Sequence, residues 1–165
     1  RIDLGLGRAP GSDQMTAYAL RRDRAGGPDD FPDDVEELSR YLGPRTDDQK
    51  VIAVPGHDTD VPMWLLGSSL FSAQLAGMRG MPYAFASHFA PRYMHEAIRV
   101  YRNHFKPSTT LDKPYVMLGI PMVVAETDEK AGYLATSVYQ RILALIRGQS
   151  LMQKPPVESL SLIHI

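Results

Sequence analysis

The sequence predicts an α/β protein in which parallel strands are covered by helices. Short apolar runs of strand length alternate along the chain with longer segments whose apolar residues recur at helical spacing. Clusters of glycine, proline and serine stand between most of these segments, as turns between strands and helices require. Such an alternation builds either an open, doubly wound sheet or an arc of an (α/β) barrel. In both architectures the functional residues lie at the carboxyl ends of the strands.

The composition fits one domain and excludes several classes of protein. The chain has 165 residues, of which 44% are hydrophobic, enough for a sizeable core. The net charge is −1 and no basic block is present, which argues against a nucleic-acid surface. No apolar run reaches the roughly 20 residues of a membrane helix, and there is no cysteine for disulfides or thiolate zinc sites. We therefore expect no membrane association and a cytoplasmic location.

The first expected unit is a strand, a glycine-rich turn and a helix. Residues 2–6 alternate apolar with polar or small side chains, which is typical of a short strand. The turn over residues 7–11 contains Pro10, and Ser12 and Asp13 then offer a cap for a helix. The glycine spacing departs from the dinucleotide-binding fingerprint, because the third glycine is one place late, a proline intrudes and no acid-ended second strand follows.

A second helix and a short strand are expected next. A helix over about residues 32–42 has a proline in its first turn and a Gly-Pro pair at its end. The apolar run Val51–Val54 predicts a short strand. His57, Asp58 and Asp60 follow, and these side chain types are metal ligands, but an Asp-rich segment after Pro-Gly is typical of a turn. We expect no metal site.

The chain is organised around residues 62–77. An apolar run of strand length, residues 62–66, is followed by apolar residues at helical spacing, namely Leu70, Phe71, Leu75 and Met78. The change of period at Gly67 predicts a strand-to-helix turn, where the glycine lets the backbone bend and Ser69 caps the helix. The hydroxyls of Ser68, Ser69 and Ser72 are expected around the first amides of that helix, which have no partner within it.

This turn can hold an anion. Free amides, hydroxyls and the positive end of the helix dipole all favour negative charge there, although helix capping alone is the other explanation of the serines. Arg8 follows the first strand, and parallel strands bring their carboxyl ends together, so its guanidinium can face the turn. A lone arginine can equally pair with a surface carboxylate. Together with the serines, Arg8 predicts a phosphate clamp.

The rest of the chain continues the alternation of strands and helices. The expected elements are a helix to about residue 79, a strand over 83–86, a helix from 91 to about 105, a strand region over 115–125 and a long helix from 128 to about 147. Gly119 and Pro121 disturb the strand region and favour a bulge or two pieces. Ser87-His88 and Glu126-Thr127 follow the last two strands, so both pairs are expected at carboxyl ends.

Four blocks of the sequence together resemble the bacterial luciferase-like flavin monooxygenases. They are residues 1–11, 62–69, 80–89 and 124–128, and the match extends to about Arg147. The Gly-Arg-Ala-Pro-Gly sequence of residues 7–11 resembles the generic luciferase-like oxidoreductases more closely than it resembles the light-emitting members. The resemblance implies a partial TIM-type (β/α)8 barrel, in which this chain supplies the fourth to seventh βα units. Residues 1–157 are then expected to form the barrel domain and residues 158–165 a tail outside the family pattern.

The resemblance also implies a cofactor and a set of site residues. Family members use reduced FMN, delivered by a separate flavin reductase, and O2 to oxygenate a small organic substrate. Their phosphate ligands, an arginine after the fourth strand and serines after the fifth, correspond here to Arg8, Ser68, Ser69 and Ser72. The other expected cofactor-binding residues are Gly7, Pro10, Gly67 and Ser87, and His88 on the same rim is the candidate catalytic residue.

Two alternatives to this activity remain open. Relatives with the same barrel transfer hydride with a deazaflavin, and the chain could also be a non-catalytic half-barrel. The first three strands and the eighth strand of the barrel are absent from the sequence, so we expect the chain to be an inactive fragment of a protein that is a dimer when complete.

Overall fold

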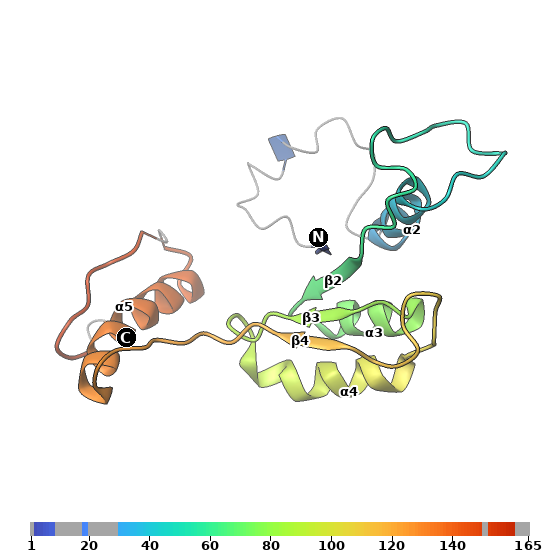
Figure 1. Ribbon diagram of the computed structural model, residues 1–165. Coiled ribbons are helices and arrows are strands. Elements are labelled where there is room, and N and C mark those ends of the chain that lie inside the picture. Colours follow the sequence, from blue (N-terminus) through green and yellow to red (C-terminus); the bar gives the residue numbers. More distant parts are fainter. Residues whose placement is uncertain (1, 9–17, 20–29, 150–151, 161–165) are drawn as a thin grey trace. The chain divides into compact units, whose positions relative to one another are not determined.

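The structure is a computed structural model that describes residues 2–8, 18–19, 30–149 and 152–160 (Figure 1). Pro10 and all but two residues of the helix expected after Ser12 and Asp13 lie outside these ranges. The chain divides into two compact units, one ending at Ile120 and the other beginning at Pro121. None of the helices in the described ranges is both long enough and apolar enough to cross a lipid bilayer.

The first unit contains a four-stranded parallel sheet in the order β1-β2-β3-β4. Its strands are β1 (Leu4–Leu6), β2 (Met63–Gly67), β3 (Tyr83–Phe85) and β4 (Val116–Leu118). The helices are α2 (Phe31–Leu42), α3 (Leu70–Arg79), the 3-10 helix η2 (Pro91–Tyr93) and α4 (Met94–His104). Neighbouring strands follow one another in the sequence, without the reversal of strand order that marks a doubly wound sheet.

The helices of this unit share one core on one face of the sheet. Leu65, Tyr83 and Phe85 point to that face and are buried, and they pack with apolar residues of the three α-helices, namely Val35, Ala73, Leu75, Ala76, Ala97 and Tyr101. On the opposite face Leu66 and Met117 are 39% and 52% exposed. A barrel carries its helices on the outside only. The predicted α/β fold, an arc of a TIM-type barrel, is confirmed.

Helix α3 packs through its small residues. Its buried residues are Ser72, Ala73, Leu75, Ala76 and Gly77, whereas the larger Leu70, Phe71 and Met78 are at least 37% exposed. A Cβ at Gly77 would lie 2.7 Å from the backbone oxygen of Tyr101 in α4. The Lys106 amide also donates to the Gly77 oxygen at 2.9 Å. The two helices therefore meet backbone to backbone, and Figure 1 shows them along the same side of the sheet.

Two tyrosines form the centre of the core. Tyr83 of β3 and Tyr101 of α4 are fully buried, with ring centroids 5.4 Å apart. The Tyr101 hydroxyl donates to the oxygen of Met81 at 2.9 Å and accepts from the amide of Tyr115 at 3.1 Å. It thus ties together the segments that enter β3 and β4. Burial raises the pKa of both phenols, Tyr83 most strongly.

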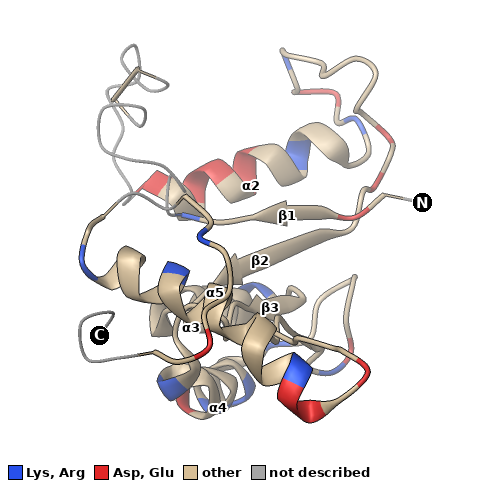
Figure 2. Ribbon diagram, turned by 90° about the vertical axis from the view of Figure 1, so that its left-hand side faces the viewer, with Lys and Arg blue, Asp and Glu red and all other residues tan. Residues whose placement is uncertain are grey.

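Helix α2 forms as its end signals predict. Pro32 lies in the first turn with two aspartates, Arg40 lies in the last turn, and the Gly43 amide closes the helix on the oxygen of Ser39 at 3.0 Å. Figure 2 shows the acidic residues towards the start of this helix. Val35 points inward and joins the core.

The strand expected at Val51–Val54 is absent, and that prediction is wrong. The segment is irregular, and Val51 and Val54 are 59% and 76% exposed. Since β1 pairs directly with β2, the sheet has no position between them for another strand. The residues that follow form the expected turn, in which Asp58 and Asp60 have positive φ and an Asp58 carboxylate oxygen accepts from the amide of Arg45 at 3.2 Å.

The last strand is shorter than the region 115–125 predicted for it. β4 ends at Leu118, directly before Gly119, and the apolar side chains beyond it, including Met122 and Val124, are exposed. Pro121 has no N–H to continue the ladder. Glu126 and Thr127 therefore do not stand at the end of a strand, contrary to the sequence-based expectation.

The second unit contains α5 (Asp128–Ile146) and the segment that returns along it. Thr127 caps the helix as predicted, with its hydroxyl accepting from the Lys130 amide at 3.2 Å. The buried side of α5 is largely polar. Gln140 donates to the Pro155 oxygen at 3.0 Å, Ser137 donates to the Lys154 oxygen, and the Thr136 hydroxyl accepts from the Val157 amide at 2.9 Å. Polar side chains of α5 thus hold the backbone of the returning segment.

We predict that Gly77→Ala destabilises the chain. Its new methyl group would meet backbone atoms of α4, which cannot rotate away, and overpacking of this kind costs roughly 1–3 kcal/mol. Urea denaturation would measure the loss in free energy of unfolding. The matched control is Gly132→Ala in α5, where a Cβ has open space and the change should stabilise the helix by about 0.5–1 kcal/mol. Equal stability of the Gly77 variant and the parent would contradict the close packing.

The buried tyrosines predict a loss of stability at alkaline pH. The folded-state pKa of Tyr83 is raised above the unfolded value of about 10. The contribution of the protonated Tyr83 to the free energy of unfolding is therefore fully present below pH ~10 and is lost as the pH rises towards the folded-state pKa. Urea denaturation at pH 7, 10 and 11 should show this decline, and Tyr83→Phe should make it shallower while changing little at pH 7. The same decline in parent and variant would refute the assignment to Tyr83.

Candidate functional site

The carboxyl end of β2 turns into α3 through Gly67, Ser68 and Ser69, as the sequence predicts. We call residues 67–72, which include the first turn of α3, the serine turn. Ser69 occupies the N-cap position with extended backbone angles of φ −115° and ψ 158°. Its hydroxyl does not accept from a helix amide, so the expected side-chain cap is not formed, and it lies 3.5 Å from the Ser72 hydroxyl oxygen instead. The first amides of α3 are left without a side-chain cap.

Gly67 is required here for space. A Cβ at this residue would lie 2.8 Å from the Cβ of Ser72, and its φ is not among the positive values of the described glycines. The absence of a side chain lets the first turn of α3 fold back on the end of β2. Ser72 is therefore buried, with 4% of its surface exposed, beneath the more open Ser68 and Ser69.

Arg8 reaches the serine turn from the end of β1. Its guanidinium carbon lies 4.4 Å from the centre of the Phe71 ring, in the first turn of α3. Among the residues that the structure describes, no carboxylate forms an ion pair with Arg8. Arg8 thus lies against the turn that carries the serines, and its role as a phosphate ligand together with them stays a prediction. Gly7 lies beside it and is exposed, and Pro10 lies outside the described residues.

Tyr83 and Phe71 adjoin this site and were not singled out as site residues from the sequence. The Tyr83 hydroxyl lies 3.5 Å from the backbone oxygen of Ser69, so the buried ring supports the turn from below. The Ala86 amide donates to the Gly67 oxygen at 3.0 Å and ties the end of β3 to the same turn. The sequence did offer a signal for Phe71, because it is an aromatic residue in the first turn of a helix that begins directly after the serines.

Ser87 and His88 follow β3 on the same edge but form a second cluster with Gly119. The buried Ser87 hydroxyl donates to the Gly119 oxygen, and the His88 amide donates to that oxygen at 3.2 Å. The exposed His88 ring places Nδ1 3.4 Å from it and lies 4.2 Å from the Phe89 ring. Both residues thus link the ends of β3 and β4, and within the described part of the chain neither forms a hydrogen bond with Arg8 or the serine turn.

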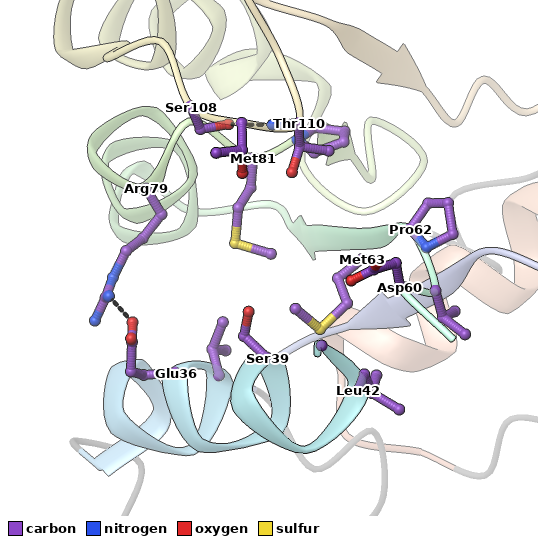
Figure 3. A pocket seen from close by; sticks show the side chains of 15 residues that line it. Glu36, Ser39, Leu42, Asp60, Pro62, Met63, Arg79, Met81, Ser108 and Thr110 are labelled. Carbon is purple, nitrogen blue, oxygen red and sulfur yellow. Dashed lines mark hydrogen bonds and ion pairs between the residues drawn. The ribbon is translucent and has the colours of Figure 1, made fainter. Parts of the chain in front are cut away.

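A cavity of about 550 Å3 lies at the other end of the sheet (Figure 3). It is bordered by α2, by Met63 at the start of β2, by Met81 before β3 and by residues 108–110. Glu36 of α2 and Arg79 of α3 form an ion pair at its side. Barrel enzymes react at the carboxyl ends of their strands, so this cavity is at the wrong end for that chemistry.

The arrangement at the carboxyl ends favours binding of an anion. It combines an arginine without a carboxylate partner in the described part of the chain, open hydroxyls at Ser68 and Ser69, and uncapped amides at the positive end of α3. These are the groups that bind phosphate oxygens in proteins. Within the described ranges no group of three or more His, Asp or Glu side chains could hold a metal ion.

Comparisons with known proteins identify the family of the chain. The family model of luciferase-like monooxygenases matches residues 1–159. The chain is 55% identical over 164 residues to the uncharacterized protein YvbT of Bacillus subtilis, covering 99% of this chain and 48% of that protein. It is 49% identical over 160 residues to a luciferase-like monooxygenase of Escherichia coli, covering 97% of this chain and 48% of the relative.

A solved structure shares the fold. The crystal structure of apo-MsnO8 matches with a TM-score of 0.82 and 32% identity, over 94% of this chain and 46% of the other. The chain therefore spans about half the length of the relatives that it matches. The family match over nearly all of the sequence leads to one conclusion: the chain belongs to the luciferase-like monooxygenase family.

Proposed function

We propose that the chain is the phosphate-binding part of a flavin-dependent monooxygenase that uses reduced FMN and O2 to oxygenate a small organic substrate. The observation that carries this proposal is the contact of Arg8 with Phe71, in the part of the serine turn that forms the first turn of α3. Family membership supports the oxygenation, and the donor set supports a phosphorylated cofactor.

The residues present fit the phosphate of FMN. The guanidinium of Arg8 supplies charge, the hydroxyls of Ser68 and Ser69 supply donors that can rotate, and the amides at the start of α3 supply fixed donors. Ser72 is buried 3.5 Å from the hydroxyl oxygen of Ser69, so it orients that hydroxyl more readily than it reaches a ligand. Gly67 leaves the space that Ser72 occupies and so keeps the first turn of α3 close to the end of β2.

The protein's contribution is to anchor and orient the cofactor. When bound, reduced flavin supplies the electrons that activate O2, and a separate reductase is the expected source of those electrons. Arg8 and the serine turn would hold the phosphate at one side of the strand ends. Ser87 and His88 lie on the same edge but in the separate Gly119 cluster. Ser87 holds the end of β3 there, and the exposed His88 ring is the group free to contact the flavin ring or the substrate.

We predict that Arg8→Ala and Ser69→Ala each weaken FMN binding by roughly 5- to 150-fold, equivalent to the 1–3 kcal/mol of a hydrogen bond to a charged group. Titration of flavin fluorescence would measure the dissociation constant, in the full-length protein that the gene encodes. Arg102→Ala, on the exposed side of α4, is the matched control and should change nothing. Unchanged FMN affinity in both site variants would remove the phosphate assignment.

The reaction type needs a separate experiment. Oxygen consumption with reduced FMN and substrate-dependent hydride transfer with a deazaflavin can be assayed side by side on the full-length protein. We expect turnover with reduced FMN. Turnover with the deazaflavin alone would replace the monooxygenase proposal by hydride transfer and leave the phosphate site standing.

A further inference from the structure

Phe71 is placed unusually for a large apolar residue of a packed helix. It is 37% exposed and is not part of the core cluster, although it stands one residue before the buried Ser72. Its ring is instead covered by the guanidinium of Arg8, whose central carbon lies 4.4 Å from the ring centre. The Phe71 ring therefore stands outside the core cluster and in contact with the cation of the candidate site.

The contact restrains Arg8 without using its hydrogen-bond donors. An arginine side chain has several rotatable bonds, and holding it in one place costs conformational entropy. A guanidinium that lies over an aromatic ring is attracted by the negative face of the ring. All five N–H donors lie in the plane of the guanidinium, so a group stacked on one face leaves the donor edges free for an oxyanion.

We propose that Phe71 is a positioning residue for the phosphate-binding arginine. Its ring holds the Arg8 guanidinium over the first turn of α3, so that the cation, the hydroxyls of Ser68 and Ser69 and the helix amides face the same anion. The inference rests on the proposed function, because the anion is taken to be the phosphate of a flavin. A merely structural Phe71 would instead stabilise the fold and affect every ligand alike.

Met78 provides the matched control. It lies in the same helix, outside the serine turn, is 49% exposed and has no ring to offer a cation. Phe71→Leu removes the aromatic face while keeping an apolar side chain, and Phe71→Tyr and Phe71→Trp keep an aromatic face. Met78→Ala removes an exposed apolar side chain of α3 at a distance from the candidate site.

The experiment compares two ligands that differ by one phosphate group. Dissociation constants for FMN and riboflavin are measured by fluorescence titration for these variants in the full-length protein. We expect Phe71→Leu to weaken FMN binding about two- to fivefold, the size of a partly exposed cation–π contact, and to leave riboflavin binding unchanged. Phe71→Tyr and Phe71→Trp should bind FMN as the parent does, and Met78→Ala should bind both flavins normally. In an Arg8→Ala background, Phe71→Leu should have no further effect.

Other outcomes separate the two proposals. If Arg8→Ala weakens FMN binding but Phe71→Leu does not, the positioning role is wrong and the phosphate site stands. The positioning role is also wrong if Phe71→Leu weakens FMN and riboflavin binding equally, or if its effect persists without Arg8. A parent protein that binds FMN no more tightly than riboflavin would overturn the phosphate site and the positioning role together.

Discussion

The backbone contact between α3 and α4 is the constraint on which the rest of the first unit depends. Gly77 has no side chain, so the two helices approach until their backbones meet, and the small Ala73 and Ala76 are fully buried in the same core. A helix held this closely has little freedom to slide or rotate. The position of its first turn relative to the end of β2 is thereby fixed. The donors at that turn are held in place by packing at the opposite end of the same helix.

The parallel sheet is the second constraint on the site, because it sets the position of Arg8 relative to the serine turn. Because β1 and β2 are paired in register, from Leu4 with Met63 to Leu6 with Leu65, the residues that follow both strands emerge at one edge. Arg8 and the serine turn are distant in sequence and adjacent in space for that reason. The site is thus built from two rigid elements and one long side chain, and the least constrained part of it, the arginine, is the part that rests on an aromatic ring.

The sequence predicted the order of the elements and the convergence at the strand ends, because hydrophobic period and parallel topology decide both. The sequence-based prediction failed where the formation or length of a strand depends on the neighbouring strand. Val51–Val54 has strand-forming residues, but the direct pairing of β1 with β2 leaves no position for it between them, and β4 stops where its partner β3 stops. The side-chain rotamers could not be predicted from the sequence either. The Ser69 hydroxyl lies near the Ser72 hydroxyl and leaves the helix amides without a side-chain cap. The small residues of α3 carry no hydrophobic period, so its tight packing could not be foreseen.

The segment that returns along α5 is held by an asymmetric set of contacts. Thr136, Ser137 and Gln140 contribute side chains, whereas residues 154–157 contribute only main-chain oxygens and an amide. Every residue type offers a main-chain oxygen, and every type except proline offers an amide, so these hydrogen bonds place no demand on the side chains of residues 154–157 beyond excluding proline at position 157. The side chains of this returning segment can therefore change during evolution, in charge or in what they recognise, provided that Thr136, Ser137 and Gln140 are kept.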